Sequence, residues 1–105
     1  MHLDDYRKKI DELDLLLVDL LNQRASIVRE IGRIKRSFEL PICEPARENL
    51  VFKNVAQANH GPLSSPDLWR IYERIIDVMR NFQKVETPEQ RDQNPGPALT
   101  PTYRE

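Results

Sequence analysis

Hydrophobic residues recur at steps of three and four along the first third of the chain, and this spacing constrains the fold more than any other feature. The positions are Leu3, Tyr6, Ile10, Leu13, Leu17, Leu20, Ile27, Ile31 and Ile34. Such spacing is typical of one face of a long amphipathic α-helix. Position 24 would continue the series, but it holds an arginine. Because an unpaired guanidinium on a buried seam is costly, we expect Arg24 to pair with an anion from the protein or from a ligand.

The helix that this pattern predicts begins at Asp4 or Asp5, either of which can cap the amides of the first turn. It extends to about residue 36, with Gly32 as its one weak helix former. Its length is then roughly 45–50 Å, longer than a domain of this size is wide. Two shorter helices of the same chain cannot bury so long a face. We therefore expect a homodimer in which the two long helices pack side by side.

The rest of the chain divides at its prolines and glycines. Residues 37–43 contain a proline that breaks a helix, and we expect them to form a loop. Pro45 suits the first turn of a second helix over about 45–59, which a glycine and a proline then end. A serine at 64 or 65 opens a third helix that extends to about residue 84. The expected inner face of that helix is Leu68, Trp69, Tyr72, Ile75, Ile76, Met79 and Phe82 or Gln83.

The fold class predicted by these elements is all-α, with one long and two shorter helices and no strand. We expect residues 1–85 to form one helical domain. Residues 86–105 are rich in proline and offer little to bury, so we expect a solvated tail or an arm laid over a neighbour. Leu99 and Tyr103 are the tail residues that could dock.

Composition excludes several classes of function. A net charge of -1 argues against a nucleic-acid surface or an anionic membrane surface, both of which require a clustered basic excess. The single cysteine, Cys43, allows no internal disulfide and fits a reducing compartment. No long apolar run predicts a membrane span or a signal peptide, so the expected location is cytoplasmic. No catalytic triad or cluster of metal ligands is recognisable, and we expect neither a metal nor another cofactor.

Charged side chains nevertheless lie on faces expected to be buried. Lys35 follows Arg24 by eleven residues, which is nearly three helical turns and places the two cations within about 20° on one face. Arg7 lies about 100° round the same helix, so it cannot easily serve the same site. In a two-fold dimer, Arg7 could reach the site of the other copy.

The complete inward polar set is mostly cationic: Arg7, Arg24, Lys35, Arg47, Glu48 and Gln83. This excess of positive charge suits a small dianionic ligand held inside a helical bundle. Two readings without a ligand also stay open. Glu44, Arg47 and Glu48 share one face of the second helix and could form a surface ion-pair cluster. Arg24 could pair with Glu48 instead of with a ligand.

Five segments of the chain, taken together, resemble the all-helical class of chorismate mutase. They are Arg7-Lys-Lys-Ile-Asp-Glu-Leu-Asp14, Leu20-Leu-Asn-Gln-Arg24, Ile31-Gly-Arg-Ile-Lys35, Pro41-Ile-Cys-Glu-Pro-Ala-Arg47-Glu48 and Ile75-Ile-Asp-Val-Met-Arg-Asn-Phe-Gln83. The resemblance covers roughly residues 3–84 and includes the spacing of the polar residues. It implies an intertwined homodimer with two equivalent sites shared between protomers. It also implies the Claisen rearrangement of chorismate to prephenate, a shikimate-pathway step towards phenylalanine and tyrosine.

The resemblance also implies a role for each site residue. Arg24 would bind one substrate carboxylate, Arg7 of the partner subunit would bind the other, and Lys35 and Gln83 would donate hydrogen bonds to the ether oxygen. Glu48 would accept from the ring hydroxyl, helped by Arg47 and by the backbone near Glu44. Met79 stands where the family often has a small hydroxyl residue, and Glu44 stands where it often has aspartate.

Three alternatives remain beside a mutase. One is an isochorismate pyruvate-lyase on the same fold, which also binds a dianion. Another is a non-catalytic dimer that binds and regulates a shikimate-pathway enzyme, with the proline-rich tail as its docking arm. The last is a plain helical dimerisation module whose inward charges pair among themselves.

Overall fold

The computed structural model describes residues 2–84 as three α-helices, with no strand in that range. Helix α1 spans Leu3–Ser37, α2 spans Pro45–Ala58 and α3 spans Ser65–Gln83. The predicted all-α class and the positions of the three helices are confirmed. The predictions about the tail, including Leu99 and Tyr103, lie outside the described residues.

The first turn of α1 corrects one prediction. The N-cap is His2, and neither Asp4 nor Asp5 occupies that position. The Asp5 carboxylate accepts a hydrogen bond from the His2 backbone N–H at 2.9 Å, as in a capping box. Both aspartates lie inside the first turn, where negative charge interacts favourably with the helix dipole. They therefore stabilise the start of α1 from within the helix.

The starts of the other two helices follow the sequence prediction. Pro45 lies in the first turn of α2, where its missing N–H has no intrahelical partner to lose. At α3 the Ser64 hydroxyl accepts from the Asp67 backbone N–H at 3.2 Å, which makes Ser64 the N-cap. Between α2 and α3, the Asn59 side-chain oxygen accepts from the Gly61 N–H at 3.0 Å and holds the turn together.

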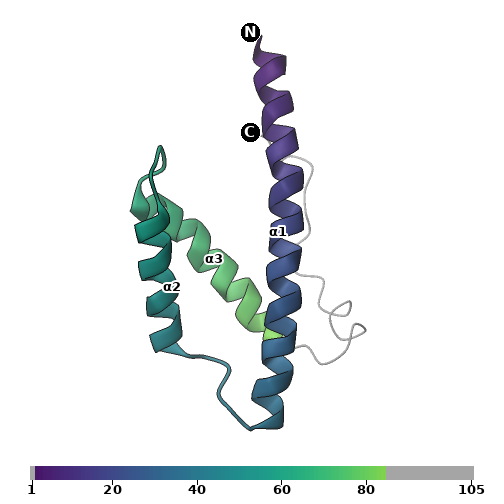
Figure 1. Cartoon of the computed structure of the whole chain (residues 1–105), viewed down its shortest axis with the longest axis vertical. Helices are drawn as coiled ribbons and strands as arrows, with labels where there is room; N and C mark the ends of the chain where they lie inside the picture. The colour runs from purple at the N-terminus through teal and green to yellow at the C-terminus, as the bar shows by residue number, and fades with distance from the viewer. Residues whose placement is uncertain (1, 85–105) are drawn as a thin grey trace.

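Helix α3 packs against both α1 and α2 (Figure 1). It runs diagonally from the end of α2 to the C-terminal half of α1, and the N-terminal half of α1 extends beyond it. Phe52 of α2 and Trp69 of α3 form an edge-to-face aromatic pair with ring centroids 4.4 Å apart. Every residue expected on the inner face of α3 is buried or half-buried. The site described below lies where α3 approaches α1.

The apolar stripe of α1 is exposed in the single chain. All nine of its hydrophobic positions are exposed, from Leu3 near the start to Ile34 near the end. Val28 and Met79, each 7% exposed, are the buried hydrophobic side chains of residues 2–84. An exposed apolar face of this extent is typical of an interaction surface. None of the helices within residues 2–84 is long and apolar enough to cross a membrane.

Candidate active site

A cavity of about 290 Å³ lies between the C-terminal half of α1, the start of α2 and the C-terminal half of α3. Its lining residues are Arg24, Ile27, Val28, Ile31, Lys35, Ile42, Glu44, Arg47, Glu48, Val51, Ile76, Met79, Arg80 and Gln83. The three helices and the loop before α2 therefore contribute side chains to one space. Each of the three helices contributes both apolar and charged side chains to its wall.

Seven of the eight predicted site residues line this cavity: Arg24, Lys35, Glu44, Arg47, Glu48, Met79 and Gln83. The eighth, Arg7, does not. Its side chain is exposed in the N-terminal half of α1, and its guanidinium lies 3.8 Å from the Asp4 carboxylate. Arg7 was expected not to serve the site of its own chain easily, and in the single chain it lies outside the cavity.

Lys35 is the most deeply placed charge of the cavity, with only 6% of the residue exposed. Its ammonium donates to the Ile42 carbonyl oxygen at 2.9 Å and to Gln83 Oε1 at 3.1 Å. The Glu44 carboxylate lies 3.7 Å away. A buried ammonium requires such partners, because it has lost most of its hydration. These contacts hold Lys35 in one orientation inside the cavity.

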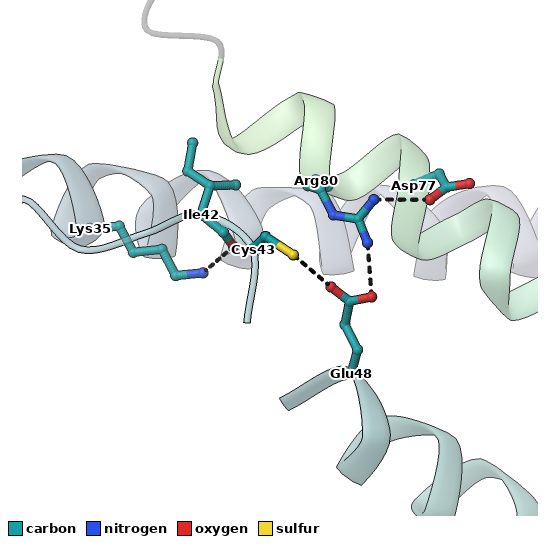
Figure 2. Close-up of polar contacts among 6 residues, drawn as sticks. All are labelled: Lys35, Ile42, Cys43, Glu48, Asp77 and Arg80. Atoms are coloured by element: carbon teal, nitrogen blue, oxygen red, sulfur yellow. Dashed lines mark hydrogen bonds and ion pairs between the residues drawn. The ribbon is translucent and has the colours of Figure 1, made fainter. Parts of the chain in front are cut away.

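The loop that brings Ile42 to Lys35 leaves α1 through a Schellman motif. The Leu40 N–H donates to the Lys35 carbonyl oxygen at 2.7 Å, and the Glu39 N–H donates to that of Arg36 at 3.3 Å. Glu39 has a positive φ of 54°, the left-handed conformation that this motif requires. The motif reverses the chain, so the Ile42 carbonyl oxygen can face the Lys35 ammonium (Figure 2).

Gln83, the last residue of α3, is held against α1 by its backbone and by its side chain. Arg36 donates a hydrogen bond to the Gln83 carbonyl oxygen. The Gln83 side chain uses its oxygen to accept from Lys35. Because an ammonium can only donate, the NH₂ of the Gln83 amide is turned away from Lys35. Lys35 and Gln83 both line the cavity, and each carries N–H groups that can donate hydrogen bonds.

Arg24 is half-buried and, within residues 2–84, makes no hydrogen bond or ion pair with another residue. The pair between Arg24 and Glu48 that the sequence left open does not form. Glu48 is bound instead by Arg80, whose Nη2 lies 2.8 Å from Oε1, and by the Cys43 thiol, 3.7 Å from Oε2 (Figure 2). The guanidinium on the α1 seam therefore lines the cavity without an anion from the described part of the chain.

Sequence reasoning missed Arg80. Its guanidinium binds the Glu48 carboxylate and, at 3.1 Å, the Asp77 carboxylate (Figure 2). The hydrogen bond to Glu48 raises the pKa of Arg80 above its ordinary value. A signal was present in the sequence, since Arg80 lies four residues after Ile76 and three before Gln83.

Four cationic and two anionic side chains line the cavity, which leaves a net charge of +2. The described residues contain no group of His, Cys, Asp or Glu that could hold a metal ion. The arrangement can bind a small dianion and direct N–H donors at an atom that gains negative charge.

Comparison with known families gives this site a context. The family model of chorismate mutase type II matches residues 6–84. This chain belongs to the type II chorismate mutase family. The resemblance noted in the sequence is confirmed, and the matched range includes α2, α3, all but the first three residues of α1 and all the residues that line the cavity.

Relatives of this chorismate mutase family member include free-standing and fused proteins. The chain is 27% identical to a chorismate mutase of Methanocaldococcus jannaschii, over 88% of this chain and 94% of that protein. It is 35% identical to a bifunctional chorismate mutase/prephenate dehydratase of Aquifex aeolicus, over 78% of this chain. The match spans only 24% of the Aquifex protein and 20% of the next bifunctional relatives.

A solved structure supports the same assignment. The chorismate mutase of Helicobacter pylori, determined in complex with prephenate, is 35% identical and superposes with a TM-score of 0.72. The superposition covers 78% of this chain and 89% of that one. The three-helix arrangement is therefore that of known chorismate mutases.

Proposed function

We propose that this chain is a chorismate mutase that rearranges chorismate to prephenate. The observation that carries the proposal is the cavity with a net charge of +2, in which Arg24 lacks an anion from the described chain. Chorismate has two carboxylates and matches this charge. The Helicobacter pylori relative was solved with prephenate, the product of the same reaction.

The chemical step requires folding of the enolpyruvyl arm over the ring and stabilisation of negative charge on the ether oxygen. We assign the second task to Lys35 and Gln83. The Lys35 ammonium is fixed by Ile42 and Glu44, so it needs little reorganisation when the charge develops. The NH₂ of Gln83, which is turned away from Lys35, can donate to the same oxygen. No proton transfer is needed for this reaction.

The remaining residues would hold the substrate. Arg24 binds one carboxylate, and Arg7 of the partner subunit binds the second. Glu48 accepts a hydrogen bond from the ring hydroxyl, with Arg47 and the backbone at Glu44 beside it on the cavity wall. Met79, which is buried and cannot donate a hydrogen bond, offers only apolar contact at the position where the family often has a hydroxyl.

The active form in this proposal is an intertwined homodimer. The apolar stripe of α1 is exposed along its whole length in the single chain, and a second copy of the same helix would cover it. Dimerisation would also bring the second Arg7 towards the cavity. Binding to a shikimate-pathway enzyme and a cytoplasmic location remain predictions from the sequence.

The test is incubation of the purified protein with chorismate, with identification of the product. We expect the native protein to form prephenate. The rate of prephenate formation should be at least about 10²-fold lower in Arg24→Ala. Arg33→Ala is the matched control, because Arg33 is an exposed α1 arginine that pairs with Glu30 and does not line the cavity. If the protein released pyruvate from isochorismate and formed no prephenate from chorismate, it would be an isochorismate pyruvate-lyase and not a mutase. Inertness towards both substrates would favour a regulatory dimer.

A further inference from the structure

The ion pair between Glu48 and Arg80 connects two helices of the fold. Within residues 2–84 it is the one ion pair that joins α2 to α3. Both side chains are about one-third exposed, at 31% each. They line the main cavity and also a second hollow between α2 and α3 that includes Phe52 and Trp69. The pair therefore forms part of the wall of the proposed active site.

The Glu48 carboxylate is held at both oxygens. Arg80 binds Oε1 at 2.8 Å, and the Cys43 thiol lies 3.7 Å from Oε2 (Figure 2). Arg80 is itself anchored by Asp77, one turn earlier on α3. A carboxylate has about four acceptor positions, so these two contacts leave about two positions for a donor from a ligand. The contacts thus hold the Glu48 carboxylate in one orientation and limit the directions from which it can accept that donor.

We propose that Arg80 is a positioning residue that acts through Glu48 and makes this end of the site select a neutral hydroxyl over an ammonium group. The inference rests on the proposed function, in which Glu48 accepts from the ring hydroxyl. Glu48 alone would attract a positively charged group more strongly than a neutral one. With a guanidinium 2.8 Å from Oε1, much of the charge of the Glu48 carboxylate is already offset, so Glu48 attracts a second cation far less strongly than a free carboxylate would.

The test compares chorismate with the analogue in which an amino group replaces the ring hydroxyl. The amino group is an alkyl amine and is protonated at neutral pH. For Arg80→Gln, we expect kcat/KM on chorismate to fall about tenfold, through loss of a charge-assisted hydrogen bond to Glu48. The ratio of kcat/KM for the amine to that for the hydroxyl should rise at least about tenfold, because the Glu48 charge is then no longer offset and can attract the ammonium group. Arg80→Lys keeps the charge and should retain the preference for the hydroxyl.

Two further variants separate positioning from packing. Arg80→Met retains the apolar stem of the side chain and should change the substrate ratio as Arg80→Gln does, even where the latter folds poorly. Arg70→Gln is the control, since Arg70 is an exposed α3 arginine that pairs with Asp67 and lines neither cavity. It should leave the substrate ratio unchanged.

A double-mutant cycle with Glu48→Gln tests whether Arg80 acts through Glu48. We expect Arg80→Gln to have little further effect in the Glu48→Gln background. If Arg80→Gln lowered kcat/KM as much in that background as in the native protein, Arg80 would contact the substrate directly, and the inference would be wrong. An unchanged substrate ratio in both neutral Arg80 variants would also overturn it, with the mutase assignment intact. A native protein inert towards chorismate would overturn both.

Discussion

Gly32 of α1 and Gln83 of α3 lie so close together that a Cβ atom at position 32 would be 2.7 Å from the Gln83 carbonyl oxygen. The same atom would lie 3.2 Å from the Gln83 Cα. Both neighbours belong to the backbone, which cannot move aside as a flexible side chain can. The missing side chain at position 32 therefore determines where the end of α3 contacts α1. It also determines where the Gln83 amide meets Lys35.

Gly32→Ala is expected to destabilise the protein and to impair the site. A methyl group would force the end of α3 away from α1, at a cost of about 1–3 kcal/mol for overpacking. The gain in helix propensity, up to about 1 kcal/mol, offsets only part of this. The shift of Gln83 should lower kcat/KM for chorismate about tenfold or more. Urea unfolding and steady-state kinetics measure the two effects. Ser26→Ala, an exposed change in the same helix, should cause neither loss.

Gln83→Glu should confine activity to acid pH. A protonated carboxyl can still donate a hydrogen bond to the ether oxygen, whereas an ionised one places negative charge beside the negative charge that develops there. The neighbouring Lys35 favours the ionised form, so activity should rise continuously as the pH falls from neutral. The pH–rate profiles of this variant and of the exposed control Gln57→Glu provide the comparison. Full activity of Gln83→Glu at about pH 8 would contradict the role assigned to Gln83.

A mixture of Arg7→Ala and Arg24→Ala chains should recover activity that neither variant has alone. If each site takes Arg7 from one protomer and Arg24 from the other, a mixed dimer contains one intact site and one doubly altered site. Equal mixing with random exchange then yields about a quarter of the native activity. The measurement is the chorismate assay after joint unfolding and refolding of the two variants. No recovery, despite exchange seen by mass spectrometry, would mean that both arginines serve the same chain.

Glu39→Gly should stabilise the protein by about 1 kcal/mol without altering catalysis. Glu39 adopts a φ of 54° in the C-terminal motif of α1, a conformation that glycine reaches without steric cost. Its side chain does not line the cavity. Urea midpoints at equal protein concentration are the appropriate measure, because the stability of the proposed dimer would depend on protein concentration. Glu30→Gly, inside α1, should shift the midpoint in the opposite direction. A lower midpoint for Glu39→Gly would refute the prediction.

The positions of the helices could be predicted because local signals agree with one another. The spacing of hydrophobic residues from Leu3 to Ile34 defines α1, and Pro45 and Ser64 define where α2 and α3 begin. Most of the cavity could be predicted for a related reason. A charge in an apolar helical pattern, such as Arg24 or Lys35, must face a polar space, and helical geometry fixes which charges share a face.

What the tertiary structure decided is which groups meet across helices. The sequence places Arg80 on the same face of α3 as Ile76 and Gln83, but only the packing of α3 against α2 brings it to Glu48. Gly32 appears as a weak point in α1, and only the crossing of α3 shows that its missing side chain admits Gln83. Sequence periodicity predicts the face of a helix on which a residue lies. The partner on that face depends on the angle and height at which helices cross, which the packing of the whole chain determines.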